Sequence, residues 1–193
     1  MTKSILLVGV GGQGTITAAK LLSAGLMEAG YDVKMSEIHG MSQRGGSVSS
    51  DVRYNETGKV DSPVISRRGA DILVSFEEME ALRWCDYVKP DGAIVVSTER
   101  IAGLPVMTGR MEYPEGIVEE LQKTAKTVFA IDAPAEAAKI GNSRVTNVIL
   151  LGAIVKYMGL ERIDWNKIIR ENVKPAFAEL NIKALELGKT LIG

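Results

Sequence analysis

The chain has 193 residues, of which 46% are hydrophobic, and a formal net charge of -1 at pH 7, which suits one globular domain over residues 1–193. This balanced charge, with no long basic cluster, excludes a nucleic-acid surface and a polybasic membrane patch, so neither nucleic acid nor a membrane is an expected partner. Cys85 is the only cysteine, which excludes an internal disulfide and any thiolate metal or iron–sulfur site built from this chain alone.

The first part of the chain predicts a βαβ unit. Residues 4–10 are an apolar strand, and residues 16–29 repeat apolar side chains at spacings of three and four, as a helix does. Residues 32–38 alternate in polarity and predict a second strand, parallel to the first. The apolar run before the first glycine is too short for a signal peptide or a membrane span, so we expect a cytoplasmic protein.

The next segment departs from a regular α/β repeat. Residues 40–46 are too few for a crossover helix, which needs at least about ten to twelve residues with its connections. Residues 47–54 alternate in polarity, and a turn at residues 55–58 leads to residues 59–66. We therefore predict an inserted β-hairpin with partly exposed strands, with Pro63 at an edge.

The remainder alternates strands and helices before it becomes helical. Strands are predicted over 71–76, 93–97 and 127–131, a short strand at Val106, and helices over 77–87 and 115–125. Asp132 is a helix cap, Gly141 ends that helix, and the chain after residue 142 is helical. The predicted fold class is α/β: a three-layer α/β/α, Rossmann-like architecture with a mostly parallel sheet and an inserted β-hairpin.

A glycine turn joins the first strand to the first helix, in the order that a phosphate-binding loop requires. Gly9 and Gly11 let the backbone turn and approach a ligand, Gly14 lets helix and strand pack closely, and N–H groups at the helix start face an anion. A tight turn with no ligand is the alternative interpretation. The candidate binding residues of this turn are Gly9, Gly11, Gly12, Gln13, Gly14 and Thr15.

A second candidate loop follows the second predicted strand, so both loops are expected at the same carboxyl edge of the sheet. Arg44 suits a bidentate contact with phosphate or carboxylate, and the adjacent glycines offer backbone N–H groups to an anion. The alternative is that Arg44 and the single histidine bond backbone carbonyls and stiffen the loop. The candidate residues are Glu37, His39, Met41, Ser42, Gln43, Arg44, Gly45 and Gly46.

Three further features have competing interpretations. Glu37 lies where the ribose-binding acid of a dinucleotide site belongs, although the missing crossover helix argues against that site, and the alternative is a salt bridge to the nearby arginine. Asn142 and Asn147, at a junction of two helices, either cap a helix or contact a ligand or partner. The acidic residues 77–80 match the dipole at a helix start and are expected to be solvated.

The glycine turn and residues 37–46 together resemble the gamma-type subunits of 2-oxoacid:ferredoxin oxidoreductases, and the helix junction with Asn142 and Asn147 fits that pattern. The motif at residues 39–46, His-Gly-Met-Ser-Gln-Arg-Gly-Gly, resembles that of the small (beta) subunits of the indolepyruvate branch of this family. The likeness extends over nearly the whole chain.

The resemblance implies a heteromeric complex that decarboxylates an arylpyruvate, reduces ferredoxin and delivers the acyl group to coenzyme A. Thiamine diphosphate and the iron–sulfur clusters are then expected on the large (alpha) partner subunit, with no cofactor bound by this chain alone. The hypothesis for this chain is that the glycine turn and the Arg44 loop face the partner's cleft, where they bind coenzyme A phosphates or shield the thiamine intermediate from water. The rival functions are a free-standing NAD(P)-binding protein and a purely structural subunit.

Overall fold

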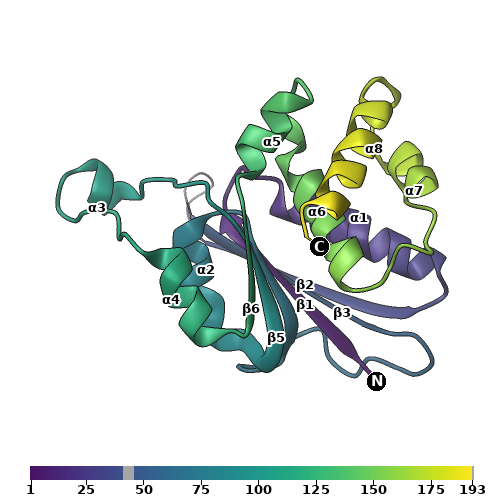
Figure 1. Cartoon of the computed structure of the whole chain (residues 1–193). Helices are drawn as coiled ribbons and strands as arrows, with labels where there is room; N and C mark the ends of the chain where they lie inside the picture. The colour runs from purple at the N-terminus through teal and green to yellow at the C-terminus, as the bar shows by residue number, and fades with distance from the viewer. Residues whose placement is uncertain (41–45, 193) are drawn as a thin grey trace.

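The structure is a computed structural model that describes residues 1–40 and 46–192, without the side chain of His39. Its strands form one sheet in the order β2-β3-β1-β4-β5-β6 (Figure 1). The strands are β1 (Lys3–Val10), β2 (Asp32–His39), β3 (Ser47–Asn55), β4 (Ala70–Ser75), β5 (Val88–Ser97) and β6 (Thr127–Ile131). The helices are α1 (Thr15–Glu28), α2 (Glu78–Trp84), η1 (Cys85–Tyr87), α3 (Leu104–Met107), α4 (Ile117–Thr124), α5 (Ala133–Lys139), η2 (Ser143–Val145), α6 (Thr146–Tyr157), α7 (Trp165–Asn172) and α8 (Pro175–Thr190).

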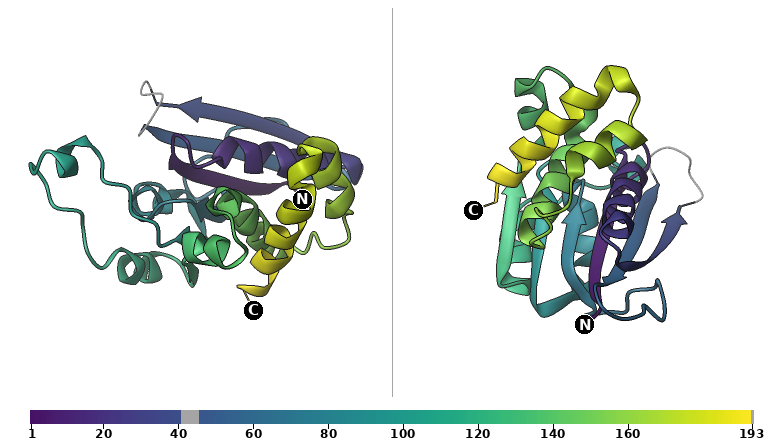
Figure 2. Two further views of the ribbon diagram at one scale, coloured as in Figure 1. Left: turned by 90° about the horizontal axis from the view of Figure 1, so that it is seen from above. Right: turned by 90° about the vertical axis from the view of Figure 1, so that its right-hand side faces the viewer.

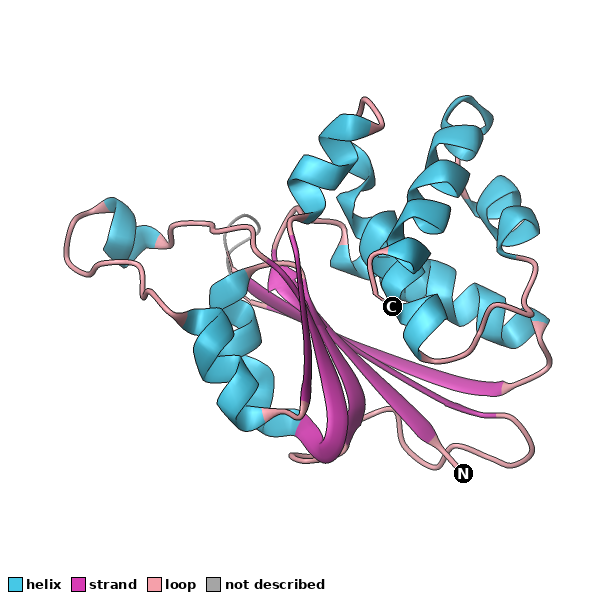
Figure 3. Ribbon diagram, viewed as in Figure 1, coloured by secondary structure: helices cyan, strands magenta, loops and turns pink. Residues whose placement is uncertain are grey.

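Helices cover both faces of the sheet, as Figure 3 shows: α1 and α5 to α8 on one side, α2 and α4 on the other. The alternation along β1 accounts for this, because Ile5 and Leu7 belong to the core under α1 and α6, whereas Leu6 and Val8 belong to the core under α2 and α4. All four side chains are fully buried. The predicted three-layer α/β/α class with a mostly parallel sheet is therefore confirmed.

The inserted hairpin is present, but its strands are β2 and β3, not the predicted pair 47–54 and 59–66. β3 pairs antiparallel with β2 on one side and with β1 on the other. The first two strands thus run in the same direction, as predicted, but β3 lies between them. The expectation that residues 47–54 form a partly exposed strand was wrong, because β3 is interior and most of its residues are buried.

Residues 59–66 form no strand, because side chains of the hairpin bind their backbone instead. The Asp32 carboxylate accepts from the Val60 amide at 2.7 Å and the Asp51 carboxylate from the Ile65 amide at 2.9 Å. The Arg53 guanidinium donates to the carbonyl oxygen of Ser62 at 2.8 Å. Burial raises the pKa of Asp51, with the Ile65 hydrogen bond opposing that shift. Hydrogen bonds with polar side chains therefore take the place of strand pairing for the backbone of residues 59–66.

Two further predictions needed correction. Val106 lies in the single helical turn α3 instead of a short strand, and the predicted helix 77–87 divides into α2 and η1. The other predicted strands and helices are confirmed, with Asp132 as the cap of α5, where its carboxylate accepts from the Ala135 amide at 3.0 Å. Within residues 1–40 and 46–192, no helix is both long and apolar enough to span a bilayer.

Candidate functional site

The glycine turn lies at the switch point of the sheet. From β1 the chain crosses by α1 towards β2 at one edge, and from β4 it crosses by α2 towards β5 on the other side, so the crevice between β1 and β4 opens at their carboxyl ends. The Gln13 side chain spans this crevice. Its Oε1 accepts from the Val10 amide at 2.7 Å, and its Nε2 donates to the carbonyl oxygen of Phe76 at 2.7 Å and to Glu99 Oε2 at 3.0 Å.

Two glycines of the turn are required by close packing. A Cβ atom at Gly9 would lie 2.9 Å from Gln13 Oε1, from Phe76 Cβ and from Thr15 Oγ1. Gly14 has a φ of 82°, and its Cβ would lie 2.8 Å from Asn147 Nδ2. Close packing therefore accounts for a glycine at position 9, whether or not a ligand approaches the turn.

The structure brings the helix junction to the glycine turn. Asn147 is buried at the start of α6 and its Nδ2 donates to the Gly14 carbonyl oxygen at 3.4 Å. Asn142 has the capping role, since its Oδ1 accepts from the Arg144 amide at 2.9 Å. The glycine turn and the helix junction, both candidate features in the sequence, thus lie together in one site.

The loop after β2 also meets the glycine turn. The Gly11 amide donates to the Gly46 carbonyl oxygen at 2.9 Å, and β3 begins immediately afterwards. Met41, Ser42, Gln43, Arg44 and Gly45 lie outside the described residues, as does the side chain of His39. Glu37 is in β2 opposite Ser50, two strands away from β1.

A groove of about 910 Å³ lies beside the glycine turn, between it and the helices of the C-terminal part. The starts of α1 and α6 and the α7–α8 junction contribute to its walls. The lining residues are Gly11, Gly12, Gln13, Gly14, Thr17, Leu21, Phe76, Glu99, Ile101, Ser143, Arg144, Thr146, Asn147, Asn172, Val173, Lys174, Phe177 and Asn181.

Two cationic side chains of the groove are available to a ligand. Arg144 and Lys174 are exposed, and neither side chain has an ion-pair partner within the part of the chain that the structure describes. By contrast, Arg100, Arg162 and Lys167 each pair with a carboxylate. No local pattern in the sequence indicates Lys174 as a site residue, because its place in the groove depends on how α8 packs.

The acidic segment at the start of α2 is buried, which corrects the expectation that it is solvated. Glu77, Glu78 and Glu80 are each at most 5% exposed. Arg100 Nε lies 2.6 Å from Glu78 Oε2, and the Tyr113 hydroxyl donates to the Glu77 carboxylate. Burial, together with the hydrogen bond to Glu77, raises the pKa of Tyr113, and the hydrogen bond with Glu78 raises the pKa of Arg100. Both groups therefore keep their protons at neutral pH.

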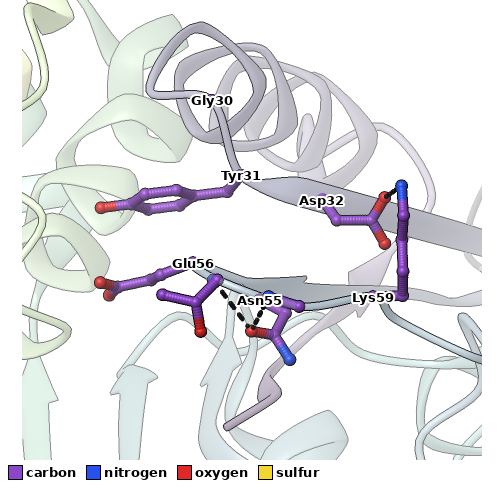
Figure 4. A pocket seen from close by; sticks show the side chains of 8 residues that line it. Gly30, Tyr31, Asp32, Asn55, Glu56 and Lys59 are labelled. Carbon is purple, nitrogen blue, oxygen red and sulfur yellow. Dashed lines mark hydrogen bonds and ion pairs between the residues drawn. The ribbon is translucent and has the colours of Figure 1, made fainter.

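A second pocket, of about 520 Å³, lies where β2 begins and β3 ends (Figure 4). Its polar groups bind one another. Asp32 pairs with Lys59 at 3.5 Å, and Asn55 Oδ1 accepts from the amides of Thr57 and Gly58 at 3.2 and 2.9 Å. The hydrogen bond from Val60 lowers the pKa of Asp32. These contacts order the loop after β3, so the groove at the glycine turn is the better candidate site.

Comparisons with known proteins agree on one family. The family model described as "Pyruvate ferredoxin/flavodoxin oxidoreductase" matches residues 4–191. The "Indolepyruvate oxidoreductase subunit IorB" of Archaeoglobus fulgidus is 37% identical over 97% of this chain and 94% of its own length. The protein of the same name from Pyrococcus horikoshii is 38% identical over 96% of this chain and 93% of its own length.

A solved structure shares the fold at low identity. It is described as 2-oxoglutarate:ferredoxin oxidoreductase from Magnetococcus marinus with 2-oxoglutarate, coenzyme A and succinyl-CoA bound. The TM-score is 0.72 at 21% identity, and the match covers 98% of this chain and 31% of that one. The same fold therefore occurs there as one part of a much longer polypeptide.

Proposed function

Because the chain belongs to the pyruvate ferredoxin/flavodoxin oxidoreductase family, we propose that it is the small subunit of an oxidoreductase complex that acts on indolepyruvate or a related arylpyruvate. The observation that carries this proposal is the sequence identity with two IorB subunits, which extends over nearly the full length of this chain and of each relative. The reaction is the oxidative decarboxylation of the 2-oxo acid to an acyl-coenzyme A, with ferredoxin as the electron acceptor.

The cofactors of this reaction belong to the partner in our proposal. When bound to the large subunit, thiamine diphosphate supplies the decarboxylation and iron–sulfur clusters carry the electrons. Iron–sulfur clusters need several cysteine thiolates, and this chain has only Cys85. In residues 1–40 and 46–192, no three His, Cys, Asp or Glu side chains form a group that would hold a metal ion. The donor set of this chain does not fit such a cluster.

The groove beside the glycine turn suits a phosphate-bearing ligand, and with thiamine diphosphate assigned to the large subunit this ligand is coenzyme A. Helices α1 and α6 both begin at the groove, and helix starts favour anions. The cations Arg144 and Lys174, which pair with no carboxylate among the described residues, add charge-assisted contacts for phosphate. In this proposal the chain holds the coenzyme A phosphates at the mouth of the partner's active site and helps to exclude water.

The groove assignment is tested with the reconstituted complex. Replacing Arg144 and Lys174 together by alanine is expected to raise the KM for coenzyme A by about 10-fold or more, because two phosphate contacts are lost. The KM for indolepyruvate is expected to stay within about 2-fold, since these side chains do not contact the 2-oxo acid. The control is Lys183→Ala, which removes an exposed lysine of α8 outside the groove. An unchanged KM for coenzyme A would favour a purely structural subunit.

The substrate assignment has its own test. The chain is copurified with its large subunit and assayed by dye reduction with indolepyruvate, pyruvate and 2-oxoglutarate at equal concentrations. We expect coenzyme A-dependent turnover with indolepyruvate to exceed the other two by about 100-fold in kcat/KM. Comparable values for pyruvate would rule out the arylpyruvate specificity while leaving the family unchanged.

A further inference from the structure

An arm carrying exposed apolar side chains projects from the molecule. Residues 98–116 leave the sheet after β5, form the turn α3 and return to α4, and both Figure 1 and Figure 2 show α3 standing well away from the sheet. Leu104 is 73% exposed, Met107 74% and Met111 62%. Such a concentration of large apolar side chains on one short segment is typical of a surface that another protein covers.

The tip of the arm has a defined backbone. The amides of Val106 and Met107 donate to the Gly103 carbonyl oxygen at 3.0 and 2.9 Å, and the amide of Met111 donates to the Pro105 carbonyl oxygen at 3.2 Å. Leu104 and Met107 are three residues apart in α3, so their side chains share one face. Hydrogen bonds within the tip therefore order its backbone, whereas the side chains of Leu104, Met107 and Met111 stay exposed.

Buried carboxylates anchor both legs of the arm. On the outgoing leg, Arg100 pairs with Glu78 at 2.6 Å, and the Ile101 amide donates to Glu77 Oε1 at 3.1 Å. On the returning leg, the Tyr113 hydroxyl donates to that same Glu77 carboxylate. Burying two carboxylates costs free energy unless they are well paired, and here the pairing fixes the base of the arm against α2. These contacts thus attach both legs of the arm to the start of α2, and the tip projects from this base.

The base of the arm is continuous with the groove, because Glu99 and Ile101 line the groove together with Gly11. A protein that closes over the groove therefore also meets the arm. We propose that Leu104, Met107 and Met111 insert into an uncharged apolar recess of the large partner subunit. Arg110 and Glu112, both exposed and of opposite charge, lie on either side of Met111 in the sequence and suit a polar rim without net charge. This inference rests on the proposed function, which supplies the partner.

The test measures binding of the full chain to its purified large subunit by calorimetry. The double variant Leu104→Ser/Met107→Ser is expected to bind at least about 30-fold more weakly than the wild type, as the loss of central apolar contacts does at other interfaces. The matched control is Met27→Ser/Val64→Ser, since these side chains are 57% and 60% exposed and lie on α1 and on the loop after β3. The control is expected to bind within about 3-fold of the wild type.

Circular dichroism verifies that both variants are folded, which is expected because all four side chains are exposed. Wild-type affinity in the arm variant overturns the inference and leaves the proposed function standing. A wild-type chain that does not bind the large subunit overturns both. A chain that dimerises through the arm, with unchanged affinity of the arm variant for the large subunit, also overturns the inference, because the occupant is then a second copy.

Discussion

At the scale of single residues, Gln13 has the largest structural role in the candidate site. Its amide connects the glycine turn after β1 to the ends of β4 and β5, through Val10, Phe76 and Glu99. Only an uncharged amide both accepts from Val10 and donates to the other two groups. A side chain of the turn itself therefore spans the crevice at the switch point, where related α/β sheets bind ligands.

Replacing Gln13 with glutamate tests this role. The carboxylate still accepts from the Val10 amide, but it cannot donate to the Phe76 carbonyl and it faces Glu99. We expect the free energy of unfolding to fall by about 2–3 kcal/mol at neutral pH. Gln122→Glu, on the exposed surface of α4, is the matched control and is expected to change it by less than about 0.5 kcal/mol. Equal urea midpoints for the two variants would contradict the assignment.

At the scale of elements, α6 and α8 lie in close contact beside the groove. Both helices contribute to its walls, with Asn147 on α6 and Phe177 on α8. A Cβ atom at Gly188 would lie 1.9 Å from the Ile149 carbonyl oxygen, and one at Gly152 would lie 2.2 Å from the Leu185 carbonyl oxygen. Because backbone atoms occupy that space, the two helices cannot approach as closely with any larger residue at either position.

Alanine at Gly188 is therefore expected to separate the two helices. We expect it to lower the free energy of unfolding by about 2–3 kcal/mol, as overpacking does in other cores. Gly103→Ala is the control, since its Cβ would meet nothing closer than Pro105 at 3.8 Å, and it is expected to cost less than about 1 kcal/mol. Urea unfolding measures both. Identical midpoints for Gly188→Ala and wild type would mean that the helices tolerate separation.

Local patterns were sufficient to predict the glycine turn, the helices with apolar repeats and the cap at Asp132. They were insufficient where the structure of a segment depends on contacts with residues far away in the sequence. Residues 59–66 follow a predicted turn, as the second strand of a hairpin does, but carboxylates of the hairpin bind their backbone. Residues 77–80 look like a solvated helix start, but Arg100 pairs with Glu78 and the Tyr113 hydroxyl donates to Glu77. The groove cation Lys174 has no local signal at all.

At the scale of the whole molecule, the position of β3 argues against a dinucleotide site. The ribose-binding acid of such a site lies at the end of the strand next to β1. Here β3 occupies that place, so Glu37 on β2 lies about 9–10 Å from β1, two strand spacings away. In addition, the Gly46 carbonyl oxygen accepts from the Gly11 amide, a group that a pyrophosphate would use.

Isothermal titration of the isolated chain with NAD⁺ and NADP⁺ checks this conclusion. We expect no saturable heat at ligand concentrations up to about 1 mM, which corresponds to binding free energies weaker than about -4 kcal/mol. A dissociation constant below about 100 μM for either nucleotide would revive the free-standing NAD(P)-binding protein as the function of this chain.

The interior position of β1 also constrains the order of assembly during synthesis. β1 pairs with β3 on one side and with β4 on the other, although both follow it in the chain. During translation this apolar strand leaves the ribosome with two unsatisfied edges, and its second neighbour is complete only at Ser75. A nascent chain that ends before Ser75 leaves at least one edge of β1 exposed. Chaperone protection is therefore most useful at this stage of translation.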